Sequence, residues 1–270
     1  MKILVIAADG AIGQGVANRL AQAGLSVTAT TTAAHTAAPI PNLQWRRVDL
    51  DVPAQLDPLA KGAQAAFYIG PTFPSPGQPQ HTALRTGVRR VRNVLGTLHK
   101  HRVPRLIYTS TAATLGTPKH AATGQDIYTP GTSPHALPNV AHAMEWEILA
   151  ANSFAFNTAV LLPTIVHDPQ EAPNTGLTPI IRALDHTPLP FWPAERSLNL
   201  INADTLIQAH LKALQHARPG QRYPVGAPQP TPLSSLHTPT TPTLPFTLPL
   251  PFKSPPPLQI WLDTHPERFG

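Results

Sequence analysis

The sequence predicts an α/β fold: a doubly wound parallel sheet with helices on both faces, followed by a small, proline-rich carboxyl-terminal lobe. Two observations predict it. Over roughly the first 160 residues, short apolar segments alternate with segments of helical periodicity, a pattern typical of a parallel sheet buried between helices. The pattern then loosens, and 12 prolines fall within residues 224–257, where long regular elements cannot persist.

The first half of the expected sheet can be followed in chain order. The apolar run 2–7 predicts a strand. Apolar residues at helical spacing then predict a helix over 11–24, marked by Ile12, Val16, Leu20 and Ala23. LSVTAT, LQWRRVDL and AAFYIG predict strands over 25–30, 43–50 and 65–70, and a helix over 53–61 separates the last two.

The second half begins with the strongest helical signal in the chain. Leucines and valines spaced alternately four and three residues apart predict a helix over 80–102. RLIYTS and TAVLLP predict strands over 105–110 and 158–163, and further helices are expected over 136–152 and 203–217.

The proline-rich segment still carries apolar residues. We expect an extended strap that packs on the body of the protein and ends in a short helix over 258–269. Its apolar anchors are Leu233, Leu236, Leu244, Phe246, Leu248, Leu250 and Phe252.

The charge balance is basic but does not indicate a nucleic-acid partner. The net charge is +6 and the isoelectric point is about 10.0, yet only 13% of the residues are charged. The densest basic cluster lies mostly on the helix expected over 80–102 and is not interleaved with aromatic residues. We interpret it as a solvated helix face; it comprises Arg85, Arg89, Arg90, Arg92, Lys100, Arg102 and Arg105.

Other classes of protein find little support. The absence of cysteine excludes disulfides and thiolate metal ligands, and the 13 histidines form no HExxH or similar metal-binding motif. No apolar run approaches the ~20 residues of a membrane-spanning helix, and Met1 leads directly into a strand without a signal-peptide pattern. We expect a cytoplasmic protein with no metal and no membrane partner.

The stretch IAADGAIG follows the first strand and opens the first helix. In a dinucleotide-binding turn three glycines allow the tight turn, the approach of pyrophosphate and close helix–strand packing. Gly10 and Gly13 stand at the second and third of these places, while Ala7 occupies the first. We expect Ala7 to be tolerated with a negative φ.

The chain resembles the extended and atypical short-chain dehydrogenase/reductases. It is most similar to dihydroflavonol-reductase-like members of the NAD-dependent epimerase/dehydratase group, with some NmrA-like character. Beside the loop, the resemblance rests on VDLDVPAQL, GVRRVRNVLGTLHKHRVPRLIYTSTAATLG, LLPTIV and ARPGQRYPVG, within about residues 1–236. It implies a Rossmann-type fold, with a dinucleotide-binding domain over 1–165 and a reduced substrate-side lobe over 166–270, joined in one compact unit.

The resemblance also implies a site for NAD or NADP, unless the cofactor has been lost. The implied contacts are Gly10, Ala11, Ile12 and Gly13 with pyrophosphate, Asp49 and Leu50 with adenine, Gly70 and Pro71 beside the ribose next to nicotinamide, and Pro163, Thr164 and Ile165 with nicotinamide. Asp49 and Pro163 are equally explained as a polar strand end and a strand terminator. Thr30, Thr31 and Thr32 occupy the end of the second strand, where Asp or Glu would select NAD and Arg would select NADP.

The catalytic positions of the family are only partly retained. Thr111 fits the hydroxyl position, but the positions of the family's Tyr and Lys fall on Leu137 and Ala141. Tyr128, His135 and His142 are candidate replacements as acid or base. Their alternative interpretations are a surface-loop tyrosine and, for the two histidines together with Glu145, a polar helix surface. His167 and Asp168 are expected at the carboxyl edge of the sheet, where ligands collect.

The sequence leaves three functions open. The first is an NAD(P)-dependent enzyme acting on a small molecule, with atypical or impaired redox chemistry. The second is a non-redox dehydratase, cyclase or isomerase acting on an apolar metabolite, because Leu137 and Ala141 make the site more apolar. The third is an NmrA-like sensor that binds a dinucleotide without turnover. The resemblance further implies a homodimer formed through the helix over 80–102 and the helix that follows it.

Overall fold

The computed structural model describes residues 1–32, 39–70, 78–118, 120, 122–133, 135–167 and 197–232. Its centre is a seven-stranded sheet in which all neighbouring strands pair in parallel, in the order β10-β6-β5-β4-β1-β2-β3. The strands are β1 (Lys2–Ile6), β2 (Ser26–Thr31), β3 (Leu43–Arg47), β4 (Ala65–Tyr68), β5 (Arg105–Thr109), β6 (Asn157–Pro163) and β10 (Gln221–Val225).

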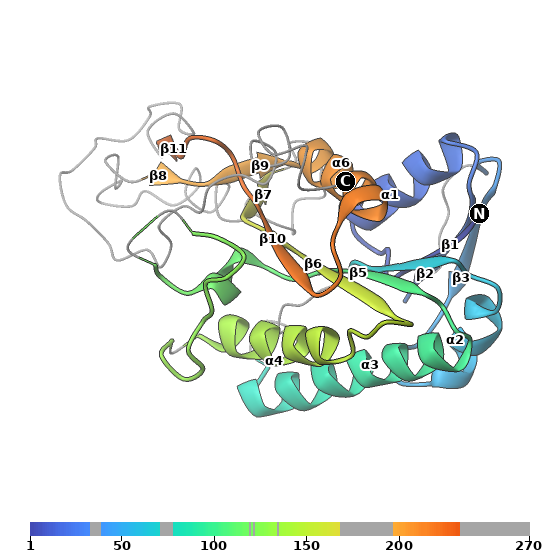
Figure 1. Ribbon diagram of the computed structural model, residues 1–270, viewed down its shortest axis with the longest axis horizontal. Helices are drawn as coiled ribbons and strands as arrows, with labels where there is room; N and C mark the ends of the chain where they lie inside the picture. The colour runs from blue at the N-terminus through green and yellow to red at the C-terminus, as the bar shows by residue number, and fades with distance from the viewer. Residues whose placement is uncertain are drawn as a thin grey trace.

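Helices cover the two faces of this sheet (Figure 1). One layer consists of α1 (Ala11–Gln22) and α6 (Ala203–His216), and the other of α2 (Pro53–Ala60), α3 (Gln80–Lys100) and α4 (Ala136–Ala150). Successive residues of a strand face opposite layers: Ile3 and Val5 pack toward α1 and α6, whereas Leu4 and Ile6 pack toward α2 and α3. Both faces are buried, so the central strands are almost entirely apolar, and the predicted Rossmann-type fold is confirmed.

The predicted elements agree with the structure to within a few residues, but the short ones were missed. The 3-10 turn η1 (Ala112–Leu115) and β10 were not predicted from the sequence. Two small strand pairings outside the main sheet were also not predicted: β7 (Ile165–His167) with β9 (Leu200–Asn202), and β8 (Ser197–Leu198) with β11 (Thr231–Pro232). β10 contains Pro224, which lies in an edge strand, where proline is tolerated. The expected strap and the terminal helix over 258–269 lie outside the described residues.

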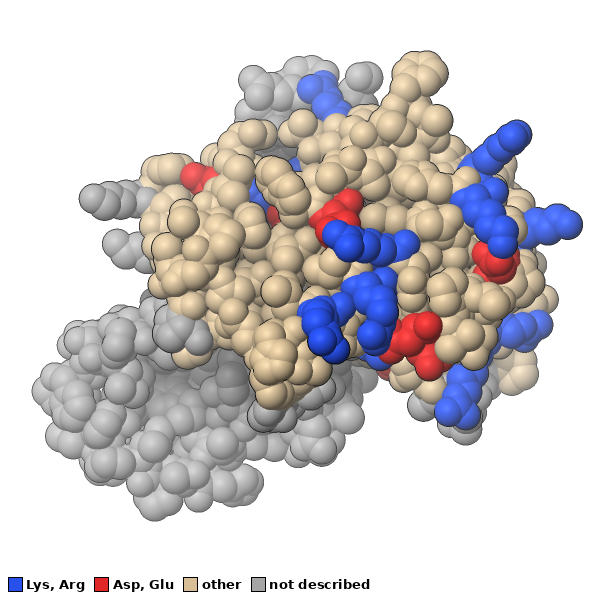
Figure 2. Space-filling model, turned by 90° about the horizontal axis from the view of Figure 1, so that it is seen from below, with Lys and Arg blue, Asp and Glu red and all other residues tan. Residues whose placement is uncertain are grey.

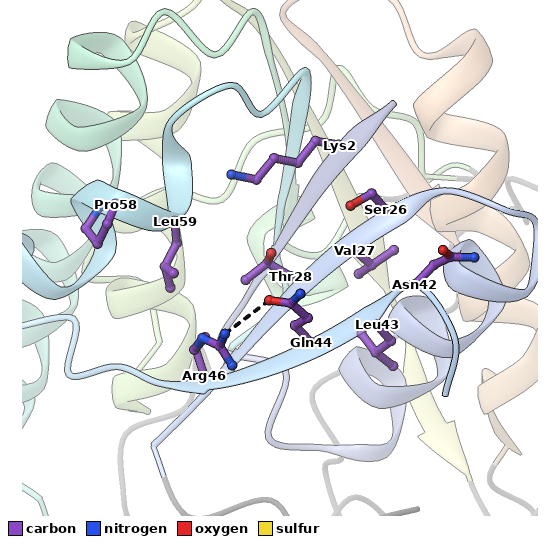
Figure 3. Close-up of a pocket in the computed structure, with 10 residues that line it drawn as sticks. All are labelled: Lys2, Ser26, Val27, Thr28, Asn42, Leu43, Gln44, Arg46, Pro58 and Leu59. Carbon is purple, nitrogen blue, oxygen red and sulfur yellow. Dashed lines mark hydrogen bonds between the residues drawn. The ribbon is translucent and has the colours of Figure 1, made fainter. Parts of the chain in front are cut away.

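The helical cover stops short of one edge of the sheet. β2 and β3 alternate apolar and polar residues, and their polar residues line a pocket of about 600 Å³ beside α2. Figure 3 shows Lys2 on one side of this pocket, with Arg46 and Gln44 hydrogen-bonded on the other. The lining comprises Lys2, Ser26, Val27, Thr28, Asn42, Leu43, Gln44, Arg46, Pro58 and Leu59. The pocket opens on the α2 side of the sheet and is not lined by the glycine loop.

Four of the seven residues of the basic cluster, all on α3, are paired with acidic residues. Arg89 and Arg90 both hold the carboxylate of Asp51, at 3.0 and 2.9 Å. Arg92 pairs with Glu147 of α4, and Lys100 pairs with Asp57 of α2. Figure 2 views the α2–α4 side of the molecule and shows basic and acidic side chains adjacent on this face. These contacts support the interpretation of the cluster as a solvated, ion-paired helix face.

A fully buried histidine joins α6 to the sheet. His210 Nε2 lies 2.7 Å from the hydroxyl of Thr109, and Nδ1 lies 2.7 Å from the carbonyl oxygen of Leu206. The carbonyl can only accept, so Nδ1 carries the proton and Nε2 accepts from Thr109. Burial lowers the pKa of His210 to about 4, because the protonated ring would lose its hydration.

This burial predicts an acid-labile fold. The unfolded histidine, with a pKa near 6.5, binds a proton that the folded histidine does not, so stability decreases as the pH falls from 7 toward 4. We expect a loss of about 2 kcal/mol from this residue by pH 5. Urea unfolding of the wild type and of His210→Gln, each at pH 7 and pH 5, measures the difference.

The variant is expected to be less stable at pH 7 but to lose less stability on acidification. An identical pH slope for both proteins would show that His210 is not the titrating group. The carboxylates with lowered pKa values, such as Asp51 and Glu147, titrate below this pH window and do not interfere.

Candidate functional site

The candidate site lies where the chain reverses its direction across the sheet. From β1 the chain proceeds through β2 to the edge at β3, and it then returns to place β4 on the other side of β1. In open α/β sheets ligands bind at the carboxyl ends of the strands at such a switch point. Here the loop after β1 leads into α1, and β4 ends at Tyr68, just before Gly70.

The loop after β1 is anchored to β2. The amide of Ala7 donates to the Thr30 hydroxyl at 3.0 Å, and the amide of Ala8 donates to the Thr30 carbonyl at 2.7 Å. Ala7 has a φ of +55°, so the expected negative φ is wrong. A left-handed conformation costs a non-glycine residue about 1–2 kcal/mol, and the two bonds to Thr30 help to hold the loop there.

Two glycines allow the close contacts of this loop. A Cβ on Gly13 would lie 2.5 Å from the Cα of Ala8, so only glycine lets α1 begin so close to β1. A Cβ on Gly70 would lie 2.4 Å from the Cβ of Ala7. The methyl group that replaces the family's first glycine therefore occupies the space above Gly70, and the two positions constrain each other.

The amino terminus of α1 is suited to an anion. Gly10 is the N-cap, it contributes no side-chain cap, and the first turn carries no acidic residue. The amides of the first turn therefore lack the side-chain partner that usually satisfies them. Gly10 is exposed, and nothing lies within 4 Å of the position of its missing Cβ. Residues Gly10, Ala11, Ile12 and Gly13 thus fit a pyrophosphate held by backbone amides and the helix dipole.

The loop also carries an acidic residue that the sequence analysis overlooked. The Oδ1 atom of Asp9 accepts hydrogen bonds from the amide of Thr32 at 2.7 Å and from its hydroxyl at 2.8 Å. The carboxylate therefore lies at the end of β2. Its place directly before Gly10 was the only signal in the sequence.

The residues predicted to lie near adenosine are partly engaged in contacts within the protein. Thr31 is buried within β2, whereas Thr32 at its end is exposed. Asp49 follows β3 and accepts from the amide of Asp51 at 2.9 Å, which supports the polar strand-end interpretation. Leu50 is buried. An adenine contact by Asp49 or Leu50 stays a prediction.

The predicted nicotinamide side begins at the end of β6. Pro163 is the last residue of β6, as a strand terminator should be. Thr164 donates its amide to Val225 at 2.9 Å and its hydroxyl to Asn199 at 2.9 Å. Ile165 donates to the Asn199 carbonyl. Asn199, which no sequence signal marked, thus fixes this corner, while Pro71, Asp168 and the side chain of His167 lie outside the described part.

Thr111 and the two positions predicted to correspond to the family's Tyr and Lys lie on neighbouring elements. Thr111 follows β5 and is the N-cap of η1, where its hydroxyl accepts from the amide of Ala113 at 3.3 Å. Leu137 and Ala141 lie one turn apart on α4, half-buried and buried respectively. η1 packs against α4 through the hydrogen bond between the hydroxyl of Thr114 and the carboxylate of Glu145.

Two of the three candidate acids and bases, Tyr128 and His142, lie next to each other. Tyr128 is 4% exposed, so its interpretation as a surface-loop residue is wrong. Its hydroxyl donates to Asn139 and accepts from the amide of Ser133, each at 3.0 Å. Its ring lies 6.0 Å from that of His142. His135 is the exposed N-cap residue of α4 and gives no side-chain cap.

His142 lies between two aromatic rings. Its ring packs edge-on against Tyr128 and stacks on Trp146, whose side chain is exposed. Burial lowers the pKa of His142, which keeps the ring neutral near pH 7. It is therefore a base rather than an acid at neutral pH.

Glu145 is buried, so its interpretation as part of a polar helix surface is wrong. Its carboxylate pairs with the guanidinium of Arg222 from β10 and accepts from the hydroxyl of Thr114 at 2.8 Å. Arg222 also donates to the carbonyl oxygens of Gly124, Asp126 and Thr114. This buried network joins β10, η1, α4 and the loop before Tyr128.

No group of three His, Asp or Glu residues in the described ranges is arranged to hold a metal ion. In the same ranges no helix has the length and hydropathy needed to cross a membrane.

The similarity to known proteins covers most of the chain. The sequence profile of the NAD dependent epimerase/dehydratase family matches residues 3–226. No curated protein sequence matches the chain. Among solved structures, a dTDP-glucose 4,6-dehydratase from Bacillus anthracis in complex with NAD is 15% identical with a TM-score of 0.69, covering 86% of this chain and 77% of the other.

Two further solved structures show the same fold. A nucleoside-diphosphate-sugar epimerase from Pseudomonas aeruginosa is 16% identical, with a TM-score of 0.70 and coverage of 87% of this chain and 75% of the other. Gre2 from Candida albicans in complex with NADPH is 17% identical, with a TM-score of 0.70 and coverage of 84% and 78%.

The contact between Ala7 and Gly70 predicts a coupled pair of substitutions. Gly70→Ala is expected to lower the free energy of unfolding by about 1–3 kcal/mol, because the new methyl group would overlap that of Ala7. Ala7→Gly should relieve both the overlap and the positive φ, so Gly70→Ala should cost less in that background. Urea unfolding of the two single variants and the double variant gives the coupling energy, and strictly additive effects would contradict the contact.

The Arg222 network predicts a large difference between a buried and an exposed ion pair. Arg222→Leu leaves the Glu145 carboxylate buried without its cation and should cost about 3–5 kcal/mol. Arg92→Leu removes an exposed pair with Glu147 and should change stability far less. Thermal unfolding of both variants compares them, and equal effects would show that the Arg222 network is not a main source of stability.

Proposed function

Because the chain belongs to the NAD dependent epimerase/dehydratase family, we propose that its switch point binds NAD or NADP and that it acts on a small-molecule substrate beside Thr111. The single observation that carries the proposal is the amino terminus of α1. Gly10 gives it an uncapped, exposed start with no acidic residue in the first turn, and Gly13 lets it begin against β1.

Residues on the two sides of the switch point would hold different parts of the dinucleotide. The first-turn amides of α1 would hold the pyrophosphate. Pro163, Thr164 and Ile165 would orient the nicotinamide end, with Thr164 kept in place by Asn199. When bound, the dinucleotide supplies or accepts hydride. Thr111 retains a proton that it can donate to a substrate oxygen.

The proton relay is the part that differs from the family. Leu137 and Ala141 carry no titratable group, and the Tyr128 hydroxyl donates to Asn139. A positioned acid or base contributes typically 10²–10⁴-fold to a rate, so we expect slow reduction of simple ketones. His142, whose lowered pKa leaves it neutral near pH 7 and whose ring centroid lies 6.0 Å from that of Tyr128, would be the base.

A second function is favoured by the same two apolar residues. The half-buried Leu137 and the buried Ala141 place apolar side chains where the family has Tyr and Lys, which would suit an apolar metabolite. In this version the protein catalyses a dehydration, cyclisation or isomerisation without net hydride transfer. Product analysis distinguishes the two functions, since only redox chemistry changes the NADH absorbance.

Dinucleotide binding is tested directly by titration. We expect NADH fluorescence or calorimetry to give a dissociation constant below about 1 mM, and Gly13→Ala to weaken it by roughly tenfold or more, because its Cβ would push α1 from the loop. Gly96→Ala is the matched control. Gly96 is exposed on α3 and nothing lies within 4 Å of the position of its missing Cβ, so affinity should not change.

The absence of binding by the wild type at millimolar NADH and NADPH would refute the proposal. Binding without turnover of any small molecule would instead favour a dinucleotide sensor.

A further inference from the structure

We infer that the carboxylate of Asp9 accepts a hydrogen bond from the adenosine ribose and makes the site selective for NAD(H) over NADP(H). The inference rests on the proposed function, because it concerns the same dinucleotide. Selective Rossmann-type sites usually place an acidic residue at the end of the second strand, where it accepts from the ribose 2′-hydroxyl. In this chain the end of β2 is a threonine run, so β2 itself supplies no carboxylate.

The loop after β1 brings a carboxylate to that place. Oδ1 of Asp9 is bonded to both the amide and the hydroxyl of Thr32, the first residue after β2. These two bonds hold the carboxylate where the phosphate loop meets the end of β2. Oδ1 is held by protein donors, so Oδ2 is the atom that would accept from the ribose hydroxyl.

Among the described residues, no charged side chain pairs with this carboxylate. Within the described ranges, Asp9 forms no ion pair with Lys, Arg or His, and its two partners are uncharged donors. Asp9 is half-exposed, so its charge acts on a ligand at the rim. A 2′-phosphate placed here would face this negative charge, whereas a 2′-hydroxyl would gain a charge-assisted hydrogen bond.

Arg47 is the residue that would favour the opposite cofactor. It ends β3, its side chain is exposed, and its Nε donates to the carbonyl of Thr32 at 3.0 Å. An arginine near the ribose can accept a 2′-phosphate. Asp9 belongs to the phosphate loop itself, whereas Arg47 approaches Thr32 from the neighbouring strand β3. The geometry therefore favours the carboxylate as the group next to the ribose.

The experiment compares the affinities of NADH and NADPH by calorimetry for three proteins. The wild type should bind NADH roughly tenfold or more tightly than NADPH. Asp9→Asn retains an oxygen that accepts both Thr32 bonds but removes the charge. It should weaken NADH and strengthen NADPH, so that the preference falls by roughly tenfold. Arg47→Gln should leave the NADH affinity unchanged.

The outcomes separate this inference from the proposed function. If the wild type binds neither dinucleotide, the proposed function fails. If it binds both equally, prefers NADPH, or keeps its preference in Asp9→Asn, only the role of Asp9 is overturned. A loss of NADPH binding in Arg47→Gln would then assign the selectivity to Arg47.

A second readout needs no variant. Repulsion between the carboxylate and a 2′-phosphate is screened by salt, so the wild-type preference for NADH should narrow as ionic strength rises from about 0.01 M to about 1 M. A preference that widens with salt would contradict an electrostatic origin in Asp9.

Discussion

The buried guanidinium of Arg222 holds together the half of the molecule that carries the candidate catalytic residues. From β10 it reaches Glu145 of α4, Thr114 of η1 and the carbonyl oxygens of Gly124 and Asp126. Both charges are almost fully removed from water, which is favourable only because nearly every donor and acceptor finds a partner. Thr111 is the N-cap of η1 and Leu137 lies on α4, so the Arg222 network links the two elements that carry these residues.

The phosphate loop depends on a different set of contacts. It is fixed by Thr30 of β2, by the close approach of Gly13 to Ala8, and by the methyl of Ala7 above Gly70. None of these contacts involves the Arg222 network. The phosphate loop is therefore held independently of the network that fixes η1 and α4.

Local periodicity predicted the helices, the central strands and the Rossmann-type fold, because burial on both faces imposes those patterns directly on the sequence. β10 was not predicted because it contains Pro224. A strand tolerates proline at the edge of a sheet, and the edge position depends on the whole sheet and not on the local sequence. The positive φ of Ala7 depends on Gly70, which belongs to another strand. Glu145 was interpreted as a surface residue because its partner Arg222 is 77 residues away, so no local pattern indicates the buried ion pair. Asp9 was overlooked because only the fold brings it to Thr32.

We propose that the amino terminus of α1 binds a nicotinamide dinucleotide through its backbone amides. Hydrogen–deuterium exchange with and without millimolar NADH tests this binding directly. We expect slower exchange of the amides at residues 8–14 on addition of NADH, with α3 unchanged as an internal reference. Unchanged exchange at residues 8–14, or protection confined to another part of the chain, would contradict it.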